Sequence, residues 1–315
     1  MSAVARALAP EDDVLAGLRE SPKRLPCRLL YDAAGAELFE QITGVDDYYP
    51  TRIEYRLLDK ILPAVSADTG PAARVIEPGA GAGCKTRRLL RALYAPAAYA
   101  GIDVSAEILE HTHRTLAREL PTVDVQTVCA DFTRPYTLPA PRRPIGKTLA
   151  FFPGSTIGNF EPFDAIMFLA GLARHAGPDG RLLLGADGTH DPAALVRAYD
   201  DVEGVTARFD LNVLEHLNHT RGARFDVARF RHRAVWNPRH ARVEMHLVSL
   251  CEQTVDVGGA VIHLDKGEPI VTEHCYKHSL PALRSMLHAA GWEPIQVLTG
   301  AEQPMRLWWC ARVVR

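Results

Sequence analysis

The stretch RVIEPGAGAGCK, residues 74–85, joins a short apolar run to three alternating glycines. Glycine permits backbone conformations, and a close approach of a ligand, that a Cβ would block. The spacing is G-x-G-x-G, and Glu77 stands two residues before the first glycine, Gly79. The dinucleotide fingerprint is G-x-G-x-x-G and the P-loop is G-x-x-x-x-G-K-S/T, so the stretch matches neither phosphate-binding pattern. We therefore predict a strand followed by a glycine loop that binds a ligand other than a phosphate.

Outward from this loop, short apolar runs alternate with longer amphipathic segments as far as residue 187. Apolar residues in the longer segments recur near helical spacing, and Ser105 is a good N-cap for one of them. Parallel strands need crossover connections, so the order β-α-β-α-β-loop-β-α-β predicts an α/β fold, a parallel sheet wrapped by helices. We expect strands at 74–77, 99–104, 123–129, 148–152 and 181–184, and helices at 85–93, 105–120 and 162–175.

Candidate ligand-binding residues follow the next two strand-like runs, because ligands of such sheets bind beyond the carboxyl ends of the strands. Asp103 ends the second run, where its carboxylate can accept both hydroxyls of a ribose. Asp131 and Phe132 follow the third run and offer an acceptor for an exocyclic amine and a ring that stacks on a purine. Together these residues predict a nucleoside pocket without phosphates. The alternative is that the glycines only form a tight turn and Asp103 only caps a helix.

Composition excludes several kinds of partner. The 315 residues include 36 basic and 38 acidic side chains, so the net charge of −2 gives no field that would gather a nucleic acid. No run reaches the roughly 18 apolar residues of a membrane-spanning helix. Glu11, Asp12 and Asp13 interrupt the apolar start of the chain before a signal-peptide cleavage site. We therefore expect a cytoplasmic protein with neither a nucleic-acid nor a membrane partner.

The cysteines and histidines predict no metal site. Six cysteines are scattered without a CxxC pair, which fits reduced thiols better than disulfides or zinc ligands. The 13 histidines include no HExxH arrangement, and no G-x-S-x-G nucleophile elbow occurs. Neither metal nor hydrolase chemistry is expected.

The order acid-x-Gly-x-Gly, then Asp103, then Asp131-Phe132 resembles the S-adenosylmethionine (SAM) site of Rossmann-like methyltransferases. Further segments resemble the histidine-specific Nα-methyltransferases, which make hercynine, the trimethylated histidine that starts ergothioneine biosynthesis. This resemblance extends over nearly the whole chain. The segments are YDAAGAELFEQIT (31–43), YYPTRIE (48–54), FFPGSTIGNF (151–160), AYDD (198–201) and TEHC (272–275).

The resemblance implies a Rossmann-like class I methyltransferase sheet together with a second, smaller substrate-binding domain. It places residues 55–196 and 279–315 in the methyltransferase domain, and residues 1–54 and 197–278 in the substrate-binding domain. Alternating strand-like runs at 229–236 and 242–250 fit an added antiparallel element in the second domain.

The resemblance also implies which residues hold the cofactor, SAM. They are Tyr31, Gly79, Gly81, Lys85, Asp103, Asp131 and Phe132. Lys85 opens the helix after the glycine loop, where it could meet the methionine carboxylate. The alternatives are that Lys85 is a solvated surface lysine and Tyr31 a core tyrosine.

For the substrate, the family likeness implies that Asn159 and Tyr199 hold the amino acid carboxylate, with Tyr48 near the amine. Glu273 and Cys275 face the side chain. A carboxylate opposite an imidazole accepts a ring N–H, which selects histidine over phenylalanine or leucine. Asn159 as a turn residue and Glu273 as a solvated edge-strand residue are the alternatives. The expected reaction is direct displacement by the α-amine, with Tyr48, Tyr31 or an ordered water receiving its proton.

One position departs from the family pattern. The family's usual sequence there is Glu-x-Ser, whereas this chain has Cys275, and a thiol is a poor hydrogen-bond donor. This departure leaves two alternatives open, an N-methyltransferase for another aromatic amino acid or amine, such as an indole, and a non-catalytic SAM-binding relative. We expect a monomer that acts on a small-molecule amino acid.

Overall fold

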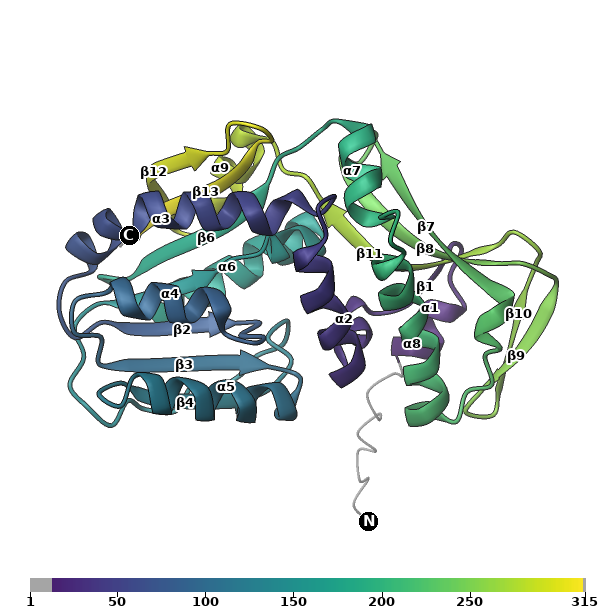
Figure 1. The fold of residues 1–315 in the computed structure, drawn as a ribbon, viewed down its shortest axis with the longest axis horizontal. Coiled ribbons are helices and arrows are strands. Elements are labelled where there is room, and N and C mark those ends of the chain that lie inside the picture. Colours follow the sequence, from purple (N-terminus) through teal and green to yellow (C-terminus); the bar gives the residue numbers. More distant parts are fainter. Residues whose placement is uncertain (1–12, 314–315) are drawn as a thin grey trace, which may run out of the picture.

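The structure, a computed structural model, describes residues 13–313, which form two main sheets with helices between and around them (Figure 1). The apolar start of the chain discussed above, residues 1–10, lies outside the described residues. No helix among residues 13–313 is long and apolar enough to cross a membrane.

The larger sheet has seven strands, and all but β13 run in the same direction. Strand β13 is antiparallel to both of its neighbours, β12 and β6. The chain builds this sheet outward from β2, first to one side and then to the other, which creates a topological switch point beside the glycine loop. In spatial order the strands are β12 (Trp292–Thr299), β13 (Met305–Arg312), β6 (Arg181–Asp187), β5 (Thr148–Phe152), β2 (Arg74–Pro78), β3 (Ala98–Asp103) and β4 (Asp124–Cys129).

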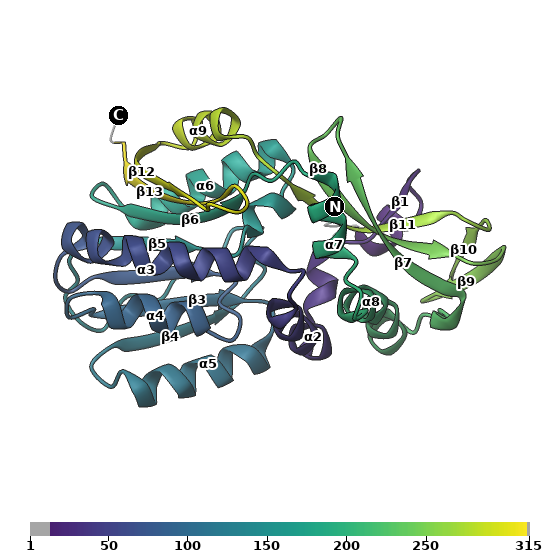
Figure 2. The same ribbon diagram turned by 45° about the horizontal axis from the view of Figure 1, so that its top comes forward.

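Helices cover both faces of this sheet, so its strands are apolar on both sides (Figure 2). Leu149 and Phe151 of β5 pack into the core on one face, and Ala150 and Phe152 pack into the core on the other. On the first face lie α3 (Tyr49–Thr69), α4 (Cys84–Ala92) and α5 (Ala106–Glu119), and on the second face lie α6 (Pro162–Ala176) and α9 (Leu280–Ala289).

The α/β prediction is confirmed, and every expected strand and helix of this sheet is present. The expected bounds agree with the observed ones to within one residue, except at β6, which continues three residues further, to Asp187. Ser105 caps α5, because its side chain accepts a hydrogen bond from the Ile108 amide.

The smaller sheet contains the antiparallel strands expected from the runs at 229–236 and 242–250. Its strand β11 has a register shift between Val271 and Glu273, where the ladder with β8 is irregular. In spatial order the strands are β1 (Lys23–Arg24), β11 (Pro269–Tyr276), β8 (Arg242–Ser249) and β7 (Phe230–Asn237). Strands β9 (Gln253–Val257) and β10 (Ala260–Leu264) form a separate hairpin.

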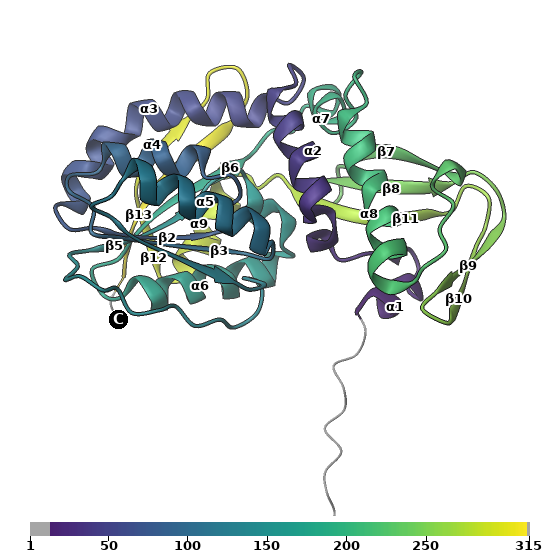
Figure 3. The same ribbon diagram turned by 60° about the horizontal axis from the view of Figure 1, so that its bottom comes forward.

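Helices α2 (Ala33–Gly44) and α8 (Val205–Arg221) pack side by side between the two sheets (Figure 3). Asp32, the N-cap of α2, ties them together by accepting a hydrogen bond from Asn212 at 2.7 Å. The remaining short elements are α1 (Asp13–Leu18), α7 (Pro192–Tyr199) and three 3₁₀ turns, η1 (Cys27–Tyr31), η2 (Thr156–Asn159) and η3 (Val227–Arg229). The proposed domain boundaries stay a prediction, and α3 runs through the one between residues 54 and 55.

Candidate functional site

A cavity lies where α2, α7, η2 and β11 meet, between the two sheets. Its volume is about 460 Å³ with the opening to solvent included. Six of the residues singled out from the sequence line it, together with apolar and small residues from these elements and from α8 and β8. The six are Tyr31, Tyr48, Asn159, Tyr199, Glu273 and Cys275.

The glycine loop lies outside this cavity, at the carboxyl end of β2. Gly79 and Gly81 have φ angles of +69° and +49°, which favour glycine. The Glu77 carboxylate, buried beneath the loop, accepts hydrogen bonds from the hydroxyls of Thr86 and Tyr99. Burial raises the pKa of Glu77 to about 7. Glu77 therefore stabilises the glycine loop by linking it to α4 and β3 through Thr86 and Tyr99.

Asp103 closes the same edge of the sheet from β3. Its carboxylate accepts hydrogen bonds from the backbone amides of Gly81, at 3.1 Å, and Ser105, also at 3.1 Å. A carboxylate has about four acceptor positions, so Asp103 retains capacity for two ribose hydroxyls. Asp103 thus shapes the glycine loop and the start of α5, and its role as the acceptor of two ribose hydroxyls stays a prediction.

Phe132 lies over the glycine loop. A Cβ placed on Gly79 would lie 3.5 Å from the Phe132 ring, which is van der Waals contact, so the ring packs directly against the loop backbone. Asp131 accepts hydrogen bonds from Thr133 through one carboxylate oxygen, and Arg28 and Arg134 lie 3.9 and 3.6 Å from the other. An open loop, a ring and two strand-end carboxylates fit an adenosyl group.

Lys85 forms an ion pair with Glu54, a fully buried carboxylate of α3, at 2.5 Å. The same carboxylate accepts hydrogen bonds from the backbone amide of Gly154 at 2.8 and 3.0 Å. Lys85 is therefore held in place rather than solvated, and it lies next to Gly154, which also lines the cavity. Gly154 thus lies between Lys85, which follows the glycine loop, and the cavity.

Tyr31 and Tyr48 lie on the aromatic side of the cavity. The ring of Tyr48 is 6.2 Å from that of Tyr199 and 6.3 Å from that of Phe39, both in edge-on geometry. Burial raises the pKa of both Tyr31 and Tyr48 well above the usual value, so both phenols are neutral. Each hydroxyl can therefore accept a hydrogen bond but cannot act as a phenolate base.

Asn159 and Glu273 meet inside the cavity. The Asn159 amide donates a hydrogen bond to Glu273 Oε2 at 3.2 Å. This contact requires η2 to approach β11 closely, and a Cβ on Gly158 would lie only 2.7 Å from the Tyr276 carbonyl oxygen. Burial raises the pKa of Glu273 to about 7, against the opposing effect of Lys277. Glu273 is consequently a buried carboxyl group that exchanges its proton near neutral pH.

Cys275 lies beside two polar groups. Its Sγ is 3.0 Å from the Tyr199 hydroxyl and 3.2 Å from Lys277 Nζ. Burial raises the pKa of Cys275, so the thiol is neutral. The Cys275 thiol therefore has two polar partners within reach inside the site.

Sequence reasoning missed Lys277 and its counterion Asp187. Both side chains are fully buried, and their charged atoms are 3.2 Å apart. The period of two in Glu273, Cys275 and Lys277 would have placed the lysine on the cavity face of a strand. Asp187 gave a weaker signal, an acid that ends an apolar run.

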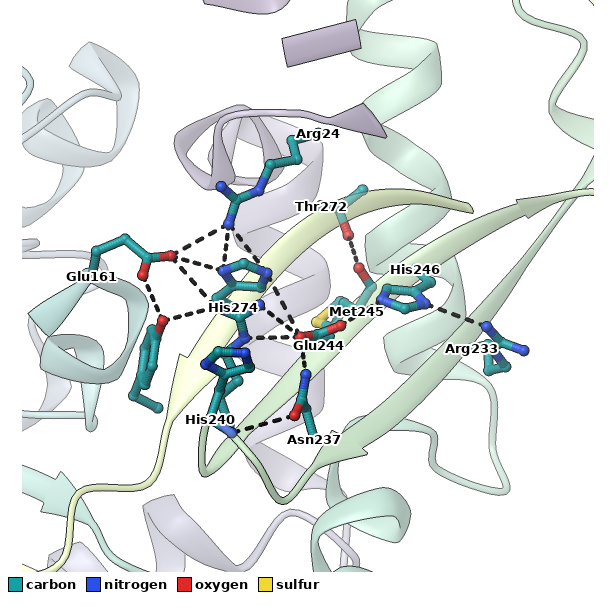
Figure 4. Close-up of polar contacts among 12 residues, drawn as sticks. Arg24, Glu161, Arg233, Asn237, His240, Glu244, Met245, His246, Thr272 and His274 are labelled. Atoms are coloured by element: carbon teal, nitrogen blue, oxygen red, sulfur yellow. Dashed lines mark hydrogen bonds and ion pairs between the residues drawn. The ribbon is translucent and has the colours of Figure 1, made fainter. Parts of the chain in front are cut away.

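The opposite face of β11 carries a different set of polar residues. Figure 4 shows Glu161, Arg24 and His274 side by side, with Glu244 and His246 on the neighbouring strand β8. His274 Nδ1 is 3.0 Å from Glu161 Oε1 and 2.7 Å from an Arg24 nitrogen. Tyr276 and Arg242 also contact Glu161. We call Arg24, Glu161, Arg242, His274 and Tyr276 the outer cluster; it joins the start of α6 to the smaller sheet.

No group of three or more His, Cys, Asp or Glu side chains that could hold a metal ion occurs within residues 13–313.

Comparison with known proteins gives a family match over nearly the whole chain. Residues 10–312 match the family model described as histidine-specific methyltransferase, SAM-dependent. The chain is 42% identical to the histidine N-alpha-methyltransferase of Mycobacterium tuberculosis over 297 residues, which cover 92% of this chain and 90% of the relative. It is 39% identical to the protein of the same name from Mycolicibacterium smegmatis, with 87% and 85% covered.

Among solved structures, the magnesium protoporphyrin IX methyltransferase of Synechocystis PCC 6803, determined with bound SAH, superposes with a TM-score of 0.50. The identity is 13%, and the match covers 90% of this chain and 97% of the other. This likeness concerns the fold, and it confirms the class I methyltransferase architecture expected from the sequence.

Proposed function

Because the chain belongs to the family of histidine-specific, SAM-dependent methyltransferases, we propose that it transfers methyl groups from SAM to the α-amino nitrogen of L-histidine. The observation that carries the proposal is a buried carboxyl group, Glu273, inside an otherwise aromatic and neutral cavity. Three rounds of transfer would give hercynine, the first compound of ergothioneine biosynthesis in organisms that make it.

The residues at the carboxyl edge of the larger sheet would hold the cofactor. Bound SAM supplies a sulfonium methyl group that a free amine can displace. Asp103 would accept the ribose hydroxyls, Phe132 would stack on the adenine and Asp131 would accept its exocyclic amine. Lys85, fixed by Glu54, would meet the methionine carboxylate, and Gly79 and Gly81 would leave room for the cofactor.

The cavity residues would hold the amino acid. Asn159 and Tyr199 are neutral donors that can fix a carboxylate geometrically, and the Tyr48 hydroxyl supplies an acceptor for an ammonium proton. Glu273 would accept an imidazole N–H, or hold the imidazolium as its counterion. Phenylalanine or leucine would leave this buried carboxyl group without a partner, which is a costly loss. The cavity would therefore prefer histidine.

The amine must lose a proton before each transfer, because an ammonium has no lone pair. The neutral Tyr48 and Tyr31 can relay that proton to water but cannot hold it as strong bases. The main contribution of the protein would be to hold the amine and the methyl group close in one orientation. The ring faces of Phe39 and Tyr48 would accommodate the growing positive charge.

The same proposal includes a cytoplasmic location. It also includes action as a monomer on a small molecule, without a nucleic-acid partner. The support is indirect. The six cysteines are free, which fits a reducing compartment, and the net charge of −2 gives little attraction for polyanions.

The test is calorimetry with S-adenosylhomocysteine (SAH) present, titrating L-histidine, its mono- and dimethyl forms, L-phenylalanine and L-tryptophan. We expect the tightest binding for histidine and its methylated forms. Tighter binding of tryptophan would instead indicate an indole substrate, and SAH binding without binding of any of these amino acids would indicate a non-catalytic relative.

A further inference from the structure

Lys277 directly follows β11 and is buried beside the cavity. Its side chain is completely buried, yet a lysine ammonium is expensive to bury unless charged and polar partners surround it. Lys277 Nζ has three such partners. It donates to the Tyr199 hydroxyl at 2.8 Å and to Cys275 Sγ at 3.2 Å, and it pairs with Asp187 Oδ2 at 3.2 Å.

Asp187 keeps this lysine charged. The Asp187 carboxylate also accepts hydrogen bonds from the Tyr49 hydroxyl at 2.6 Å and from the Thr189 amide and hydroxyl. Although burial opposes ionisation, the Lys277 ammonium and these donors hold the pKa of Asp187 below its usual value. Burial likewise opposes protonation of Lys277, but the ionised Asp187 beside it raises its pKa. Both members of the pair are therefore ionised.

The donor inventory fixes the direction of the Tyr199 hydroxyl. An ammonium is a donor only, so the Tyr199 oxygen must accept from Lys277 and direct its own O–H elsewhere. The atom within reach is Cys275 Sγ, at 3.0 Å, and a sulfur is a weak acceptor that a carboxylate easily replaces. Tyr199 lines the cavity, whereas Lys277 does not. The Tyr199 hydroxyl therefore lies between the cavity and the Lys277 ammonium, which does not line the cavity itself, and the ammonium polarises that hydroxyl as a donor.

We propose that Lys277 is the positioning residue for the substrate α-carboxylate: its ammonium orients the Tyr199 hydroxyl as a donor and supplies the positive charge that the cavity lining lacks. This inference rests on the proposed function, because it assumes an amino acid substrate. No lysine or arginine is among the residues that line the cavity, and the Lys277 ammonium contacts one of the lining hydroxyls directly, that of Tyr199. The pair with Asp187 crosses from the smaller sheet to the larger one and so fixes both halves of the site together.

The test compares the affinities of L-histidine and histamine, measured by calorimetry with SAH present. Histamine has the same imidazole and amine but no carboxylate, so the ratio of the two affinities reports carboxylate recognition. We expect the Lys277→Met variant to lower this ratio about 10- to 100-fold, the range for loss of a charge-assisted hydrogen bond. Lys147→Met is the matched control, since Lys147 pairs with Asp68 away from the cavity, and should keep the wild-type ratio.

Two further variants separate this role from a structural one. Lys277→Met leaves the buried Asp187 unpaired and could unfold, so the charge-balanced double variant Lys277→Met/Asp187→Asn should show the same loss in a protein that still binds SAH. Asp187→Asn alone leaves the ammonium without its counterion and should keep or increase the ratio. A merely structural ion pair would lower the ratio in all three variants alike, and an unchanged ratio in the double variant would overturn the inference. Failure of the wild-type protein to bind histidine would instead contradict the proposed function.

Discussion

Strand β11 presents Glu273 and Cys275 to the cavity and His274 and Tyr276 to the outer cluster. On the cavity face, Glu273 has one side-chain donor among residues 13–313, Asn159, and burial raises its pKa to about 7. On the opposite face, Glu161 contacts all four other members of the outer cluster. Despite partial burial, the bonds from Tyr276 and His274 lower the pKa of Glu161.

This difference in hydrogen-bond partners between the two faces of β11 indicates which face binds a ligand. A buried polar group with too few partners is costly unless a ligand completes its hydrogen bonds, whereas a fully partnered group has no such capacity left. The cavity face is therefore suited to binding, and the outer face is suited to holding η2 and α6 against the smaller sheet. The predictions below test that division.

The largest effect is expected for Glu273. The Glu273→Ala variant should lose its preference for histidine over phenylalanine by about 100-fold, because a charge-assisted hydrogen bond to the imidazole is lost. Competition assays with both amino acids measure this, and SAH affinity should stay near that of the wild type. Glu268→Gln is the matched control at the start of the same strand, outside the cavity. Unchanged selectivity would remove Glu273 from the site.

Loss of one hydroxyl should matter more on the cavity side. Tyr199→Phe should raise the KM for histidine about tenfold, because the carboxylate loses a donor. Tyr276→Phe makes the same chemical change in the outer cluster, where the hydroxyl bonds Glu161 and Arg242, and should leave KM within about twofold. Steady-state kinetics of both variants decide the matter. Equal effects on KM would contradict the division between the two faces.

The two faces should also respond to pH with opposite signs. The raised pKa of Glu273 favours its neutral form in the folded protein, so its stability contribution is present below about pH 4.5 and is lost as pH rises through about 7. Glu244 on β8 behaves in the opposite way. Hydrogen bonds from Asn237 and Arg242 outweigh burial and lower its pKa to about 2. Its contribution to stability is therefore present above about pH 4.5 and is lost as pH falls towards 2.

Denaturant unfolding of the free protein at pH 8 and pH 5 tests these signs. Glu273→Gln should stabilise the protein on the order of 1 kcal/mol at pH 8 and have little effect at pH 5, because only the carboxylate form is penalised by burial. Glu244→Gln should destabilise at both values. Destabilisation of the Glu273→Gln variant at pH 8 would show that this carboxylate is well compensated without a ligand.

The smallest effect is expected at Glu161, in the outer cluster. Glu161→Gln should cost less than about 1 kcal/mol of stability, since its carboxylate is partly exposed and its ion pairs are screened. Because Asn159 is two residues away, KM for histidine should rise about twofold to threefold, with SAH affinity unchanged. A large fall in kcat alone would place Glu161 in the reaction and contradict its role as an anchor.

The sequence predicted the larger sheet well, because hydrophobic periodicity and the strand-end acids are local signals. Residues 74–187 show strands and helices within a few positions of those expected. The family motifs singled out six side chains that the fold brings to one cavity. The glycine loop was recognisable because backbone geometry demands glycine at Gly79 and Gly81.

Other features depend on tertiary contacts that no local pattern encodes. The Lys277–Asp187 pair joins residues 90 positions apart through the packing of two sheets. The ion pair between Lys85 and Glu54 joins α4 to α3 and was expected to be a contact with ligand or solvent. The irregularity before Glu273 shifts which residues of β11 face the cavity, and its origin lies in the pairing with β8.

The central claim is that a clamped histidine receives methyl groups on its α-nitrogen because Glu273 recognises its ring. The most direct measurement is product analysis by mass spectrometry and NMR after incubation with SAM and an equimolar mixture of L-histidine, L-phenylalanine and L-tryptophan. We expect histidine to be the methylated amino acid, with all three methyl groups on the α-nitrogen. Methylation of a ring nitrogen, or of phenylalanine or tryptophan ahead of histidine, would contradict it.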